Sequence, residues 1–238
     1  MAQQTSVASP LLAKIRERGH WRVVIRPGRF ERERIPDIAA LYPLLRERAV
    51  RLRGWQFPQV TVGQDYRIGL DWIDKEVEVR EYVEYWRLYQ SGQFLDVAGL
   101  PIDWLDHSAF PVAPPDWQPG QYLPVVDVLY RYTEIFEFAA RLALIEAYSI
   151  SDWVHLEIAL RGLHGRRLYN DVPGTTIFLS DREAQIEEFP YEADLPRSEL
   201  IADAHRLALH QAEQLCQRFG GSQTPGLLES IQAKFVRS

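Results

Sequence analysis

The turn from Arg161 to Arg167 contains a local group of side chains that could bind an anion. Gly162 and Gly165 let the backbone turn tightly, and the cationic side chains between and around them are Arg161, His164, Arg166 and Arg167. Backbone amides and guanidiniums that converge in this way can hold a carboxylate or a phosphate. A solvent-exposed hairpin tip explains the same residues. Both interpretations stay open, and these four residues are predicted partner-binding residues.

A second group of candidate residues lies in a β-hairpin predicted for residues 79–99, which turns at Ser91-Gly92. A two-residue loop there would pair Gln90 with Gln93, and side chains would then alternate between two faces. The predicted core face holds Trp86, Leu88, Leu95 and Val97. The other face holds Tyr85, Arg87, Tyr89, Phe94 and Asp96.

The face with the aromatic and arginine residues has two interpretations. Another helix or loop covers it, in which case the Arg87–Asp96 pair is structural. Alternatively it is an open platform, because Tyr and Arg are enriched where protein partners or unstacked bases bind. We prefer the covered face. Under the second interpretation the predicted binding residues are Tyr85, Arg87, Tyr89 and Phe94.

Two further clusters are candidates for metal sites. His205 and His210 lie five positions apart, about 140° around a helix, whereas a shared metal needs a spacing of three or four. The acidic residues Asp65, Asp71 and Asp74, followed by Lys75, resemble the acids of metal-dependent nucleases. Cross-strand pairing and edge solubility explain them as well.

No motif of the chain identifies a catalytic centre. It has no glycine-rich phosphate loop and no Gly-x-Ser-x-Gly elbow. We therefore predict no catalytic residue, no metal ligand and no cofactor. A metal-dependent hydrolase acting on nucleic acid remains the alternative function.

Charge is distributed unevenly along the chain. The net charge is −6, but residues 1–53 hold twelve Lys or Arg against five acidic residues, so that this part is +7 and the remainder −13. A basic amino-terminal region attracts nucleic acid, or it pairs with acidic parts of the same chain or of a protein partner. Because the whole chain is acidic, self-complementation or a protein partner is preferred to nucleic acid.

The remaining patterns predict an α+β fold with a mostly antiparallel sheet. Apolar residues alternate in 66–72 and 152–160, as in half-buried strands, and residues 21–26 form a β-branched run. Residues 124–147 predict a long central helix, apolar on most of its circumference, and 197–219 predict a further helix packed with it.

Length and composition favour one large domain. The chain has 238 residues, 46% of them hydrophobic, enough for a substantial core. Residues 1–9 are predicted to be a disordered terminus and 10–238 a single α+β domain. Its alternative division is into lobes 10–100 and 124–238, joined by the proline- and aromatic-rich segment 101–123.

The cysteine content and the lack of membrane-spanning or signal segments indicate the cellular compartment. Cys216 is the single cysteine, which fits a reducing compartment, and no apolar run reaches the roughly 20 residues that span a membrane. No signal peptide is recognisable. We predict a cytoplasmic protein without a membrane partner, and the sequence does not indicate its oligomeric state.

Several short stretches together resemble a loosely described group of uncharacterised bacterial proteins. They are His20–Pro27, Arg34–Pro36, Arg53–Trp55 and Tyr85–Phe94 (YWRLYQSGQF). Some members of that group are associated with an AlbA-like, Schlafen-type DNA-binding module. The resemblance covers about the first hundred residues and implies a bacterial accessory or regulatory protein, without any transferable active-site residue.

These observations favour a non-enzymatic interaction module. We expect it to bind a protein or nucleic-acid partner through the basic amino-terminal region and the Tyr/Arg hairpin face.

Overall fold

The computed structural model describes residues 9–52, 54–63, 65–105, 117–169, 179–219 and 226–236. Most of the predicted terminus 1–9 and residues 106–116 of the predicted connecting segment lie outside these ranges. Within them, the structure confirms the α+β class and the mostly antiparallel sheet.

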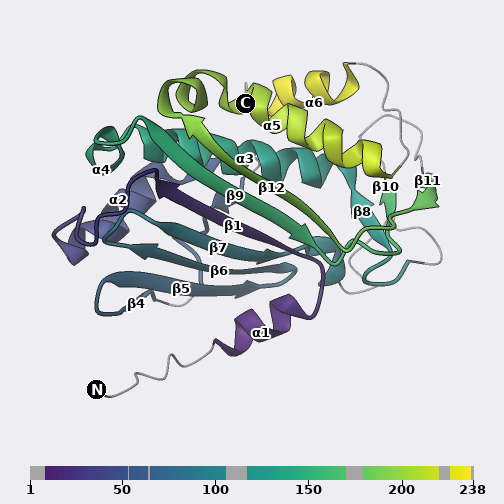
Figure 1. The fold of residues 1–238 in the computed structure, drawn as a ribbon. Helices are drawn as coiled ribbons and strands as arrows, with labels where there is room; N and C mark the ends of the chain where they lie inside the picture. The colour runs from purple at the N-terminus through teal and green to yellow at the C-terminus, as the bar shows by residue number, and fades with distance from the viewer. Residues whose placement is uncertain are drawn as a thin grey trace.

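Seven strands form the main sheet, in the order β12-β9-β1-β7-β6-β5-β4, and all neighbouring strands are antiparallel (Figure 1). Their bounds are β1 (His20–Pro27), β4 (Arg67–Ile68), β5 (Trp72–Val79), β6 (Tyr82–Tyr89), β7 (Phe94–Gly99), β9 (Trp153–Arg161) and β12 (Glu188–Pro196). The sheet therefore combines strands from both sides of the segment 101–123.

Three helices cover one face of this sheet: α3 (Val125–Ala143), α5 (Arg197–Arg218) and α6 (Leu227–Val236). The long apolar helix predicted for 124–147 is α3, and most of its residues are buried. Alternate strand residues such as Trp21, Trp86 and Ile158 face the helices and are fully or almost fully buried. We call this side of the sheet the core face.

The opposite side of the sheet, which we call the α1 face, is covered in part by α1 (Pro10–Arg16) (Figure 1). The hydroxyl of Ser9 accepts a hydrogen bond from the Leu12 amide at 3.0 Å and Pro10 occupies the first turn, which fixes where this helix begins. Leu11 and Ile15 then pack on Val83 and Val97.

Shorter elements complete the structure. A three-stranded sheet contains β8 (Tyr122–Pro124), β10 (Arg167–Tyr169) and β11 (Leu179–Glu183), and a two-stranded sheet contains β2 (Val50–Arg51) and β3 (Gln56–Phe57). The remaining helices are α2 (Leu41–Arg48), α4 (Glu146–Ser149) and two 3₁₀ turns, Ile38–Ala40 and Pro101–Asp103. Among the described residues, no helix is both long and apolar enough to cross a membrane.

The structure confirms the hairpin, but the predicted pairing of its two strands was wrong by one residue. The structure pairs Leu88 with Phe94, Arg87 with Leu95 and Trp86 with Asp96. The loop has one residue more than predicted, with Gly92 at φ +83° and the Tyr89 amide donating to the Gln93 carbonyl.

This shift moves every side chain of β7 to the other face of the sheet. Phe94 and Asp96 belong to the core face, where both are 0% exposed, and the predicted Arg87–Asp96 pair does not form. Leu95 and Val97 share the α1 face with Tyr85, Arg87 and Tyr89.

Candidate functional site

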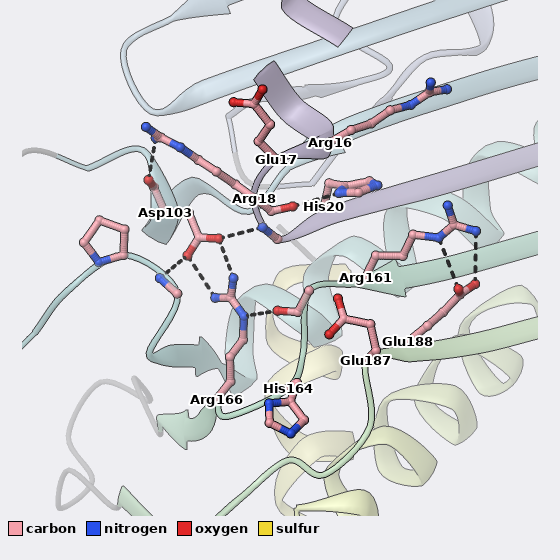
Figure 2. A pocket seen from close by; sticks show the side chains of 14 residues that line it. Arg16, Glu17, Arg18, His20, Asp103, Arg161, His164, Arg166, Glu187 and Glu188 are labelled. Carbon is pink, nitrogen blue, oxygen red and sulfur yellow. Dashed lines mark hydrogen bonds and ion pairs between the residues drawn. The ribbon is translucent and has the colours of Figure 1, made fainter. Parts of the chain in front are cut away.

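A pocket of about 690 Å³ lies at the end of the sheet where α1 leads into β1 (Figure 2). Three segments form its wall: residues 16–20 at the α1–β1 junction, residues 161–166 at the end of β9 and in the turn that follows it, and Glu187 and Glu188 at the start of β12. Asp103, Pro119 and Gly120 complete it. We call this the loop pocket.

The buried ion pair between Arg166 and Asp103 connects these segments. Each side chain is only 2% exposed. Both terminal nitrogens of Arg166 donate to the Asp103 carboxylate, and its remaining donors reach the carbonyls of Tyr122 at 2.9 Å and Gly162 at 2.6 Å. Asp103 also accepts from the amides of Gly19 and Gly120, both at 3.0 Å. A buried pair with its hydrogen bonds satisfied in this way holds its surroundings in one arrangement.

Two glycines let the segments approach each other closely. A Cβ atom at Gly19 would lie 2.2 Å from Nη2 of Arg166, and one at Gly162 would lie 3.0 Å from the Cα of Gly19. Gly162 also has φ +70°, a conformation that favours glycine. The turn after β9 and the α1–β1 junction therefore meet backbone to backbone.

The remaining charged side chains of the pocket are less constrained. Arg161 faces Glu188 across the strands with Nε 3.2 Å from Oε2, and both side chains stay more than one third exposed. The Arg18 guanidinium donates to the Asp103 carbonyl at 2.8 Å and lies 4.3 Å from the ring centroid of Trp104. The exposed titratable residues that line the pocket are Arg16, Glu17, Arg18, His164 and Glu187.

The pKa of the His20 imidazole depends on its burial and on the charges around the pocket. Burial is the main cause that lowers the pKa of its imidazole, and the hydrogen bond to the Arg18 carbonyl acts against it by raising the pKa. The cationic side chains of Arg161 and Arg16 lower the pKa further. Glu188 acts in the opposite sense and is the weakest of these influences. Among the charges near His20, the two guanidiniums therefore outweigh the carboxylate of Glu188.

The structure brings together three of the four cationic residues predicted in the turn. Arg161 and His164 line the loop pocket, His164 exposed and Arg161 with a side chain that is 43% exposed. Arg166 lines it too, but its donors are already used inside the protein, so it positions the pocket rather than meeting a partner. Arg167 is not among the lining residues, and its guanidinium pairs with Glu183 at 2.8 Å.

The other residues that line the pocket were not predicted to bind a partner, among them Arg16, Arg18, His20 and Asp103. The excess of arginine in residues 1–53 pointed to Arg16 and Arg18, although not to their location. Asp103 had no signal, because its partner Arg166 is 63 positions away in the chain.

The hairpin residues predicted to bind a partner are used largely within the protein. The Arg87 guanidinium lies 3.9 Å from the Trp72 ring centroid and donates to Asp74 at 2.8 Å, and the Tyr85 hydroxyl donates to the same carboxylate at 2.9 Å. Tyr85 is 4% exposed. Phe94 lies on the core face against the rings of Phe57 and Phe138. Only Arg87 and Tyr89 remain partly exposed.

The acidic residues considered for a nuclease are not gathered around a free site. Asp74 is 1% exposed and accepts from Arg67, Arg87 and Tyr85. His205 pairs with Glu137 at 3.0 Å, and His210 is exposed on α5. Within the described ranges, no three His, Cys, Asp or Glu side chains are arranged to hold a metal ion.

Comparison of the chain with protein-family models, with curated proteins and with solved structures found no match.

Proposed function

We propose that this chain is a non-enzymatic, cytoplasmic accessory or regulatory module that binds a protein partner through an acidic group held in the loop pocket. The observation that carries the proposal is the buried Asp103–Arg166 pair, which fixes the wall of the pocket while leaving Arg16, Arg18 and Arg161 at its surface. Guanidiniums on a rigid support lose little entropy when they bind a carboxylate.

The charges around the pocket support an anionic group. The Asp103 carboxylate is already occupied by Arg166 and two backbone amides. The Arg161–Glu188 pair has contacts of 3.2 and 3.4 Å and lies more than one third exposed, so a bound carboxylate can compete with Glu188 for the guanidinium. Arg16 and Arg18 add two positive charges from the neighbouring segment.

The same charges favour a protein over nucleic acid. Glu17 and Glu187 also line the pocket, and both would repel neighbouring phosphates of a polyanion. On the α1 face, Arg22 pairs with Glu157 and Arg87 with Asp74, so these two guanidiniums are already neutralised within the protein. A single acidic side chain amid neutral ones suits such a mixed surface better.

Binding of a fluorescent glutamate-rich peptide tests this proposal. Arg161→Gln should weaken binding about tenfold, because a charge-assisted hydrogen bond is worth about 1.5–3 kcal/mol. Arg206→Gln is the matched control, because Arg206 lies exposed on α5, on the other side of the sheet. Equal loss in both variants, or no peptide binding, contradicts the proposal.

Two further measurements make the experiment specific. Glu187→Gln should strengthen peptide binding, since it removes a negative charge from the pocket wall. A single-stranded oligonucleotide should bind less tightly than the peptide. Tighter oligonucleotide binding that falls steeply with salt would instead assign the pocket to nucleic acid.

A further inference from the structure

His20 occupies a particular place in the loop pocket, between two guanidiniums. It is the first residue of β1 and lies opposite Arg161 of β9, so the two side chains share one face of the sheet. Arg16 reaches the same place from the end of α1. Figure 2 shows the side chains of Arg16 and Arg161 on the side of the imidazole that points away from the Arg18 carbonyl.

The hydrogen bond to that carbonyl fixes the tautomer of His20. Nδ1 lies 2.8 Å from the Arg18 carbonyl oxygen, which accepts only, so Nδ1 carries the hydrogen. In the neutral imidazole Nε2 then carries a lone pair. Among the residues that the structure describes, His20 makes no hydrogen bond besides the one at Nδ1, which leaves Nε2 open to a ligand in the pocket. Its lone pair would repel an anion, whereas a protonated Nε2 would donate to one.

The other charged groups near His20 come from every segment of the pocket. Glu188 of β12 faces it through Arg161, and the side chains of Glu17, Arg18, His164 and Glu187 surround the opening. The Asp103–Arg166 pair lies beneath and is internally neutral. Burial and the two guanidiniums lower the pKa of the imidazole and so disfavour its protonation, against the hydrogen bond to the Arg18 carbonyl, which raises it.

We infer that the acidic group bound in the loop pocket sits between Arg16 and Arg161 against Nε2 of His20, and that its binding places a proton on this nitrogen. The inference rests on the proposed function and adds its regulation: affinity rises as the pH falls. The bound anion compensates the two guanidiniums that oppose protonation and accepts the new Nε2–H. Proton uptake and anion binding are then linked, and each strengthens the other.

Sulfate is a suitable probe, because it stays dianionic from about pH 5 to about pH 8 and any pH dependence belongs to the protein. Its affinity should rise with falling pH by up to about tenfold per pH unit. His20→Gln should abolish this slope, while His210→Gln, at an exposed position of α5, should keep it. In the wild-type protein, the NMR titration of the His20 imidazole should move to higher pH when sulfate is present.

The outcomes separate this inference from the proposed function. A sulfate affinity independent of pH, an unchanged His20 titration, or a slope lost in His164→Gln rather than in His20→Gln overturns the inference. Absence of sulfate binding overturns it as well. In each case, peptide binding that depends on Arg161 would leave the proposed function standing.

Discussion

At the scale of single residues, Asp103 connects parts of the chain that are remote in sequence. It accepts from Arg166, Gly19 and Gly120, which belong to three different segments. Removing its charge leaves the Arg166 guanidinium buried without compensation, and breaking a buried pair in this way costs about 3–5 kcal/mol.

Asp103→Asn should therefore lower the midpoint of urea unfolding markedly and also weaken peptide binding. The control is Asp203→Asn, because Asp203 makes an exposed pair with Arg206 on α5. This control should unfold at the wild-type urea concentration. Equal stability of Asp103→Asn and the wild type would show that the pair does not hold the pocket together.

A second residue-scale feature is the buried carboxyl pair of Glu84 and Asp96 on the core face. They come from neighbouring strands and are 4% and 0% exposed. Glu84 accepts from the Gln59 amide at 3.1 Å, and Arg131 of α3 supplies a nearby positive charge. Burial first, and then the negative charge of Glu84, raise the pKa of Asp96 well above its usual value.

This shift predicts the sign of a pH effect on stability. A carboxyl whose pKa is raised by folding stabilises the protein fully below its unfolded pKa of about 3.9, and this stabilisation is lost as the pH rises through the folded pKa. Asp96→Asn removes that loss. The free energy of unfolding of the variant should therefore increase relative to wild type between about pH 5 and about pH 9. A difference that does not change with pH would contradict the raised pKa.

At the scale of elements, the β6–β7 hairpin shows how far local sequence predicts structure. Its two strands follow from the aromatic and β-branched runs, and α3 follows from its apolar circumference. The pairing of the two strands does not follow from the local sequence, because a Ser-Gly turn fits loops of different length. The choice depends on residues far away in the sequence, because Phe94 packs against the rings of Phe57 and Phe138.

Two substitutions in β7 distinguish the pairings. Phe94→Ala should cost about 3–5 kcal/mol of unfolding free energy, since it leaves a cavity next to the rings of Phe57 and Phe138. Leu95→Ala should cost much less, because Leu95 is partly exposed on the α1 face. Chemical denaturation of both variants measures the order. The two-residue loop would give the opposite order, with the larger loss at Leu95.

At the scale of the whole molecule, the candidate site exists only because the fold joins distant segments. The turn after β9 could be recognised from its glycines and basic residues. The sequence indicated the junction at residues 16–20 only as an excess of basic residues, and it did not indicate Asp103 at all. Their meeting depends on β1 lying between β9 and β7 in the sheet, which no local pattern encodes.

The two predicted binding surfaces, the hairpin face and the turn after β9, have different roles in the structure. The hairpin residues Arg87 and Tyr85 serve Asp74 and Trp72 within the protein, whereas Arg161 and His164 face a pocket. A partner bound in the pocket would contact the α1–β1 junction and the start of β12. We therefore expect the basic amino-terminal region to act through Arg16 and Arg18.

Chemical-shift mapping with the glutamate-rich peptide tests this location most directly. In isotope-labelled protein, saturating peptide should shift the amides of Gly19, Arg161 and Gly162 most strongly, and Arg161→Gln should reduce these shifts while Arg206→Gln should not. Shifts concentrated at residues 85–89 on the hairpin, or no shifts at a peptide concentration that saturates binding, would contradict an anion-binding loop pocket.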